Sequence, residues 1–169
     1  MDRTLRKNKM DTPTIERIKE FHPNFRDKLL SEYLEINSQL PKGVRLRFTS
    51  VFRTIKEQNE LYAQGRTKSG LIVTNAKGGE SIHNYGLAFD IVILLDEDKN
   101  GTFEKAVWNG THFNKVVKYF VSKGYEWGGS WKFKDAPHFQ IRGQNWNKLK
   151  LLIVKGNFIE DNSIVYPKI

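Results

Sequence analysis

Residues 88–95 read A-F-D-I-V-I-L-L, a nearly continuous apolar run that contains a single acid, Asp90. Such a run predicts a central β-strand that is covered on both faces. An ionised carboxylate inside an apolar strand is costly unless it is paired or bound to a metal ion. The sequence therefore predicts that a partner for the Asp90 carboxylate lies beside this strand.

The regions around this strand predict helices and further strands. Residues 44–48 alternate between apolar and polar side chains, which indicates a strand with one face in the core. Thr54 and Glu57 match a capping box, and the helix that they open ends at Gly65. Because helices come first and last with strands between, we expect an α+β fold with a small, mainly antiparallel sheet flanked by helices. The remaining helices are predicted over residues 11–21, 24–40, 113–124 and 146–154, and short strands over 125–127 and 139–141.

The length of the chain, 169 residues, is typical of one domain. We expect residues 11–169 to form a single domain that follows a basic, flexible arm at residues 1–10. The residues beyond Val154 show little pattern and are expected to form a tail.

The charge and the residue types limit the classes of function. A net charge of +9 favours polyanions such as nucleic acid, acidic lipid or acidic wall polymers, without choosing among them. The absence of cysteine excludes disulfide scaffolds, cysteine zinc fingers and thiol nucleophiles. No apolar run approaches the roughly 20 residues of a membrane span, and no secretory signal is recognisable at the start. Any metal site must therefore use His, Asp or Glu.

Residues 81–90, S-I-H-N-Y-G-L-A-F-D, place a histidine just before the buried acid. Gly86 allows the backbone to turn, so that the His83 imidazole and the Asp90 carboxylate could face one cavity. A structural hydrogen bond between these two side chains is the alternative interpretation.

A second histidine and a second acid lie in residues 127–141, W-G-G-S-W-K-F-K-D-A-P-H-F-Q-I. Asp135 and His138 reach a common site only if the chain bends around Ala136 and Pro137. Two imidazoles and one carboxylate form a usual catalytic zinc set, which leaves a fourth position for water. A further carboxylate can take the proton of that water, so the chain supplies a complete complement.

The motifs resemble those of the zinc peptidases related to D-alanyl-D-alanine carboxypeptidases. Within these they resemble the L-alanyl-D-glutamate endopeptidases found among phage endolysins, over roughly residues 20–142. The motifs are S-x-H-x-x-G-x-A-x-D at 81–90, D-x-x-H-F at 135–139, T-S-V-F-R-T at 49–54, E-Q-x-x-L-Y-A-Q-G-R-T at 57–67, V-T-N-A-K at 73–77 and W-G-G-S-W at 127–131.

The resemblance implies the hedgehog-like fold of the D-alanyl-D-alanine peptidases, with a zinc site at the sheet. It implies that zinc is bound by three residues and that Asp135 is the general base. It also implies that Arg53 holds the substrate or its developing oxyanion. Ser81 is then expected in the same site. From the residues alone, Trp131 beside Gly128 and Gly129 is expected to shape a substrate groove, and a place in the core is the alternative. The implied zinc ligands are His83, Asp90 and His138.

The function expected from this resemblance is zinc-dependent hydrolysis of the peptidoglycan stem peptide, at the bond between L-alanine and D-glutamate. Such a monomeric wall-lytic enzyme would be made in the cytoplasm without a signal peptide and act on the wall after release. The alternatives are a D-alanyl-D-alanine carboxypeptidase on the same scaffold and a noncatalytic wall-binding domain. A basic nucleic-acid binder is a third, but no specific nucleic-acid-binding motif accompanies the charge.

A calcium site is the weaker metal prediction. Residues 96–104, D-E-D-K-N-G-T-F-E, carry oxygen ligands at Asp96, Asp98 and Asn100 in the spacing of a calcium loop. Val107 stands where the bidentate glutamate belongs, and a solvated Asx turn is the alternative.

Overall fold

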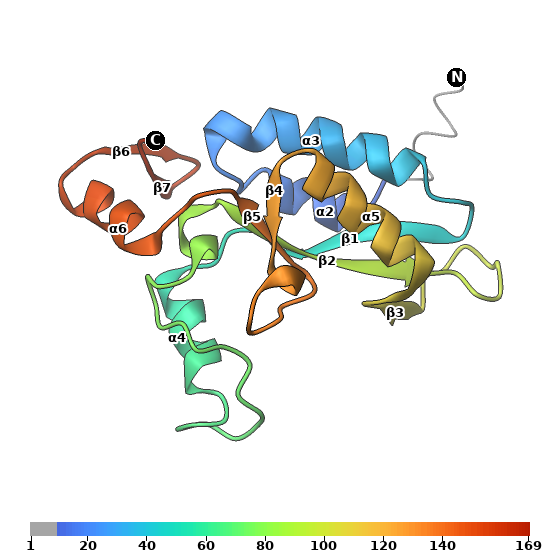
Figure 1. Cartoon of the computed structure of the whole chain (residues 1–169), viewed down its shortest axis with the longest axis horizontal. Coiled ribbons are helices and arrows are strands. Elements are labelled where there is room, and N and C mark those ends of the chain that lie inside the picture. Colours follow the sequence, from blue (N-terminus) through green and yellow to red (C-terminus); the bar gives the residue numbers. More distant parts are fainter. Residues whose placement is uncertain (1–9) are drawn as a thin grey trace.

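The computed structural model of the chain describes residues 10–169 (Figure 1). The predicted α+β class is confirmed, because a five-stranded antiparallel sheet packs against helices that precede, interrupt and follow its strands. Of the arm predicted at residues 1–10, only Met10 lies among the described residues. No helix within the described part is long and apolar enough to cross a membrane.

The sheet has the strand order β1-β2-β5-β4, and β3 also pairs with β2. The central strand is the predicted apolar run, and its register places Asp90 opposite Ser50 of β1 and opposite His138 of β5. The central position of β2 therefore brings side chains from three strands to one place. The strands are β1 (Val44–Ser50), β2 (Ala88–Leu95), β3 (Lys105–Val107), β4 (Tyr125–Trp127) and β5 (His138–Ile141).

Helices α3 and α5 cover one face of the sheet, as Figure 1 shows. The Phe89 ring stacks between Phe48 and Phe139, at centroid distances of 4.7 and 5.4 Å, beneath Phe120 of α5. Because side chains alternate along a strand, the neighbour of Phe89, Asp90, points to the opposite face. The helices are α2 (Thr12–Ile18), α3 (Pro23–Ser38), α4 (Ile55–Ala63), α5 (Gly110–Ser122) and α6 (Trp146–Val154), with the 3₁₀ turns η1 (Ile82–Tyr85) and η2 (Gly128–Ser130).

The prediction of a patternless tail beyond Val154 is wrong. Strands β6 (Phe158–Asp161) and β7 (Ile164–Pro167) form an antiparallel hairpin. Its turn places Asn162 and Ser163 at positive φ, 49° and 63°, the geometry of a tight hairpin turn. Such turns usually carry glycine, so the turn had no strong sequence signal.

The hairpin is anchored to the junction between α2 and α3 through His22, which is fully buried. The ring Nε2 lies 2.8 Å from the carbonyl oxygen of Pro167, and Nδ1 accepts the backbone N–H of Asn24. A carbonyl only accepts, so Nε2 carries the proton and the ring is neutral. His22 thus caps α3 and holds β7, which is a structural role.

The His22 contacts predict a pH dependence of stability. Burial lowers the pKa of His22, so between its unfolded value near 6.5 and the lower folded value only the unfolded chain binds the proton. The contribution is fully present above that unfolded value and decreases as the pH falls below it. In His22→Asn, the difference in urea midpoint between pH 7.5 and 5.0 should be smaller than in the wild type. An equal difference in both proteins would contradict this account.

Candidate metal centre

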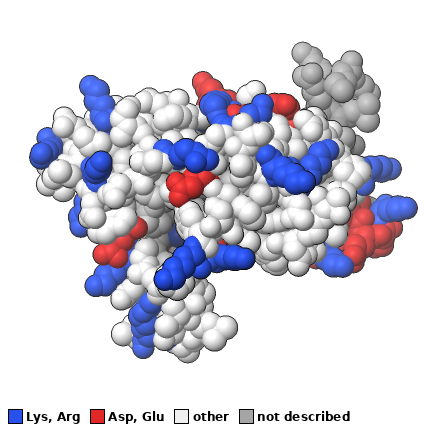
Figure 2. All heavy atoms as spheres, in the orientation of Figure 1, with Lys and Arg blue, Asp and Glu red and all other residues white. Residues whose placement is uncertain are grey.

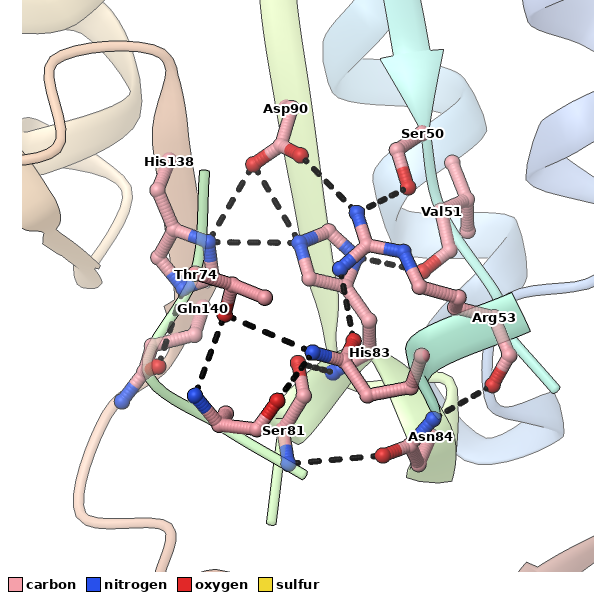
Figure 3. Close-up of polar contacts among 12 residues, drawn as sticks. Ser50, Val51, Arg53, Thr74, Ser81, His83, Asn84, Asp90, His138 and Gln140 are labelled. Atoms are coloured by element: carbon pink, nitrogen blue, oxygen red, sulfur yellow. Dashed lines mark hydrogen bonds and ion pairs between the residues drawn. The ribbon is translucent and has the colours of Figure 1, made fainter. Parts of the chain in front are cut away.

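Three side chains meet on the face of the sheet away from α3 and α5 (Figure 3). Asp90 Oδ1 lies 3.2 Å from His83 Nε2 and 3.2 Å from His138 Nδ1. The two ring nitrogens are also 3.2 Å apart, so the three atoms form an equilateral triangle. The structure thus brings together the three predicted zinc ligands, from η1, β2 and β5.

Local backbone geometry carries His83 into this position. Ser81 caps η1, because its Oγ accepts the backbone N–H of His83. Gly86 ends the turn in the left-handed conformation, with φ 65°, and a Cβ there would lie 2.7 Å from the Tyr166 ring. The backbone N–H of His22 donates to the Gly86 carbonyl oxygen at 2.8 Å. Glycine is therefore required at this turn for both its φ and its space.

In each histidine, the ring nitrogen that faces away from the triangle (the outer nitrogen) determines whether the one that faces into it (the inner nitrogen) carries a proton. His83 Nδ1 lies 2.8 Å from the carbonyl oxygen of Val51, and His138 Nε2 lies 3.0 Å from Gln140 Oε1. Both partners are acceptors, so each outer nitrogen carries the proton and each inner nitrogen presents a lone pair. Two lone pairs and a carboxylate oxygen then face one another, an arrangement that requires a cation or an added proton at its centre.

The dimensions of the triangle fit zinc. Ligand atoms bound at about 2.0–2.1 Å in a tetrahedron lie about 3.3 Å apart, close to the observed separations. Burial raises the pKa of Asp90, but His83 and His138 outweigh it and hold that pKa well below its usual range. Burial lowers the pKa of His138, but the hydrogen bond and the charge of Asp90 together have a larger effect, so this pKa is raised above its usual value. Both shifts reflect a site that attracts positive charge.

Arg53 lies beside the triangle and is held from two sides. Its guanidinium donates to Gln58 Oε1 at 2.9 Å and to Ser50 Oγ at 3.1 Å, and Nη2 lies 3.6 Å from Asp90 Oδ2. Its side chain is only 17% exposed, so Arg53 is not a surface residue that pairs with Asp90 in solvent. Gln58 is fully buried, and its Nε2 donates to the carbonyl oxygen of Ala76. The Arg53 guanidinium is therefore positioned by Ser50 of β1 and by Gln58 of α4. Gln58 is in turn held by the loop that follows α4.

Asp135 lies outside the triangle, on the loop between β4 and β5. The predicted bend exists, because the backbone N–H of His138 donates to the Asp135 carbonyl oxygen. Burial raises the pKa of Asp135, and the negative charge of Asp90 raises it further, against the opposite effects of His138, His83 and Arg53. Asp135 is not one of the three residues whose ligand atoms face one another.

Trp131 also lies beside the centre. Its ring centroid is 5.1 Å from that of His138, and its Nε1 donates to Glu126 Oε1 at 2.8 Å. The ring is therefore held as one wall of the metal site.

Sequence reasoning missed Gln140 and Gln58. Gln140 follows His138 by two residues on the same strand, so the strand period alone would have placed both on one face. Gln58 falls four residues after the cap Thr54, but only the folded loop reveals its contacts with Arg53 and Ala76.

The second acidic group lies in the loop between β2 and β3. Oxygens of Asp96, Asp98 and Glu104 lie within 4.8 Å of one another. Asp98 Oδ1 accepts the backbone N–H of Asn100, and Asp96 Oδ2 accepts that of Gly101. The first contact is an Asx turn, the predicted alternative. The structure does not support the calcium site predicted at Asp96, Asp98 and Asn100.

Part of the chain matches a known protein family. Residues 74–141, which contain all three facing side chains, match the family model described as D-alanyl-D-alanine carboxypeptidase. The predicted family resemblance is confirmed. The match includes Asp135 and Gln140 but not Arg53, which lies before it.

Two individual proteins extend the comparison. Over 110 residues the chain is 46% identical to the peptidoglycan L-alanyl-D-glutamate endopeptidase CwlK of Bacillus subtilis, a match that covers 59% of this chain and 62% of CwlK. The chain thus matches less than two thirds of that relative's length. The crystal structure of the L-Ala D-Glu endopeptidase ChiX of Serratia marcescens superposes with a TM-score of 0.53 at 20% identity, covering 78% of this chain and 88% of ChiX. This structural similarity shows that the two chains share a fold.

Replacement of Gln140 should weaken metal binding. In Gln140→Leu the outer nitrogen of His138 loses its acceptor, so the ring is no longer held in the tautomer that presents Nδ1 inward. Zinc affinity should fall about 10–100-fold, the usual effect of losing such a partner. A competition titration with a chromogenic chelator measures it. Gln140→Glu, which keeps an acceptor, is the matched control, and equal affinity in both variants would contradict the assignment.

Proposed function

We propose that this protein is a zinc-dependent peptidoglycan endopeptidase that hydrolyses the stem peptide between L-alanine and D-glutamate. The observation that carries the proposal is the triangle of two imidazole nitrogens and one carboxylate oxygen, with Arg53 3.6 Å from that carboxylate. The 46% identity to CwlK, an endopeptidase for this bond, supports the substrate.

His83, Asp90 and His138 would hold the zinc, which when bound supplies a Lewis acid and lowers the pKa of water. Asp135 acts as the general base that takes a proton from the attacking water. Burial raises the pKa of Asp135 in the metal-free site, which makes its carboxylate a stronger proton acceptor than an exposed one. The carboxylic acid formed then returns the proton to the leaving amine.

Arg53 stabilises the negative charge that develops on the oxygen of the attacked carbonyl, or holds a substrate carboxylate. Its contacts with Ser50 and Gln58 fix the guanidinium before substrate arrives, so little reorganisation is needed during the reaction. Trp131, beside His138, forms one wall of the substrate groove. Ser81 serves the same site by capping η1, in addition to any contact with substrate.

The alternative activity is that of a D-alanyl-D-alanine carboxypeptidase, which the description of the matching family favours. The two activities release different fragments, so mass spectrometry of a muropeptide digest distinguishes them. An endopeptidase gives peptides that begin with D-glutamate, whereas a carboxypeptidase releases free D-alanine. A noncatalytic wall-binding domain would give neither, and it is disfavoured because Asp135 is present.

Peptidoglycan is the proposed partner, and acidic wall polymers would attract the +9 chain by charge. Figure 2 shows Lys and Arg side chains spread over the visible face, with acidic side chains gathered near the loop between β2 and β3. A spread of this kind suits a long polyanion better than a sequence-specific nucleic-acid site. We further propose a monomeric endolysin that is made in the cytoplasm and acts on the wall after release.

The Asp135→Asn variant should show whether Asp135 acts as the general base or as a zinc ligand. The variant keeps the shape of the side chain but loses the proton acceptor, so zinc content should be unchanged while cleavage falls about 10²-fold or more. His138→Ala should instead lose the metal. Zinc content and muropeptide cleavage are measured on the same preparations. Full zinc with near-normal cleavage in Asp135→Asn would refute the catalytic assignment.

Arg53→Ala should retain zinc and lose turnover. Loss of a preorganised donor to a developing oxyanion typically lowers kcat by about 10²–10³-fold. Lys148→Ala, which removes an exposed cation from α6, is the control for net charge. A variant with normal turnover and only a small loss of stability would assign Arg53 to a structural ion pair.

A further inference from the structure

The loop between β4 and β5 is closed into a short, fixed projection. The carbonyl oxygen of Gly128 accepts the backbone N–H of Trp131 at 3.1 Å and that of Asp135 at 3.0 Å. Trp127 Nε1 donates to the carbonyl oxygen of Ala136 at 2.7 Å, which closes the base of the loop. Residues 132–134 therefore form a tip whose two ends are fixed to a single peptide group. Figure 1 shows this loop projecting from the sheet between β4 and β5.

The tip carries Phe133, whose side chain is 80% exposed. The exposed fraction is larger than that of Trp108 (51%) or Phe158 (42%), the other strongly exposed Phe and Trp residues in the described part of the chain. The Phe133 ring has no aromatic stacking partner among residues 10–169, and the Lys132 ammonium lies 5.9 Å from its centroid. A fixed loop thus presents an aromatic face to solvent.

The position of this face relative to the metal centre is known from both ends of the tip. The Trp131 ring centroid lies 5.1 Å from that of His138, and the carbonyl oxygen of Asp135 accepts the backbone N–H of His138 at 3.2 Å. Phe133 lies two positions before Asp135, which limits the distance between their Cα atoms to about 7 Å. Phe133 therefore lies at the rim of the centre.

The proposed substrate carries a sugar close to the bond that is attacked. In peptidoglycan the stem L-alanine is joined through a lactyl group to N-acetylmuramic acid. Two residue-length units, roughly 7 Å when extended, then separate the attacked carbonyl from the sugar ring. A pyranose ring has a face of polarised C–H groups, and these are attracted to the negative face of an aromatic ring.

We propose that Phe133 stacks on the N-acetylmuramic acid ring and makes the protein select glycan-linked stem peptides over free ones. This inference rests on the proposed function and adds a sugar subsite to it. Stacking also accounts for an apolar ring that is exposed on a loop fixed beside the metal centre.

The experiment compares two substrates with the same peptide. One is the disaccharide muropeptide, and the other is the peptide released from it by an amidase and then N-acetylated, so that both have a neutral amide at L-alanine. In Phe133→Ala, kcat/KM for the muropeptide should fall about three- to tenfold through KM, while that for the acetylated peptide is unchanged. Phe133→Trp should retain selectivity and Phe133→Leu should lose it, because only Trp keeps the aromatic face. The matched control, Phe158→Ala on β6, should change neither value.

An equal effect of Phe133→Ala on both substrates, or no effect on either, would overturn the sugar subsite. Isothermal titration of both ligands into the Asp135→Asn variant, with and without Phe133→Ala, provides a readout that does not need turnover. If the wild type cleaves neither substrate, the proposed function fails. In that case a loss of muropeptide binding alone in Phe133→Ala still supports the subsite, and unchanged binding overturns it.

Discussion

The structure depends on one electrostatic constraint, which is that three electron-pair donors face one another at 3.2 Å on the open face of the sheet. One strand register and one turn make this possible, because β2 pairs with β5 at Asp90 and His138, and η1 supplies His83. The hydrogen bonds behind the two rings orient their lone pairs inward. A positive charge at the centre would relieve the repulsion, so metal binding and the stability of this part of the fold are linked.

The groups around this centre come from well-separated elements that hold one another. Arg53 follows β1, and its backbone N–H donates to the carbonyl oxygen of His83 while its guanidinium is held by Gln58 of α4. Gln58 in turn binds the backbone of the loop after α4 at Ala76. A shift of that loop would therefore be transmitted to the cation beside Asp90, which makes the loop part of the site although it supplies no ligand.

The metal-ligand residues were easier to predict from the sequence than the residues that hold them in place. Asp90 was recognisable because an acid inside an apolar strand needs a partner, and the strand itself was recognisable from its length and continuity. The tautomers of the two histidines were not, because they depend on Val51 and Gln140, which become partners only after the strands pair. The β6–β7 hairpin was missed for a local reason, since Asn162 and Ser163 adopt positive φ without the glycine that usually marks such a turn.

The contact of Tyr166 with Gly86 has a consequence for biosynthesis. The turn that carries His83 is supported by the backbone of His22 on one side and by a ring from β7 on the other. Proteins leave the ribosome from the N-terminus, so the sheet and α3 can form while β7 is still being made. A nascent chain that lacks β7 has every ligand but not the support behind its ligand turn. Full metal affinity should therefore develop late in synthesis, once β7 has been made.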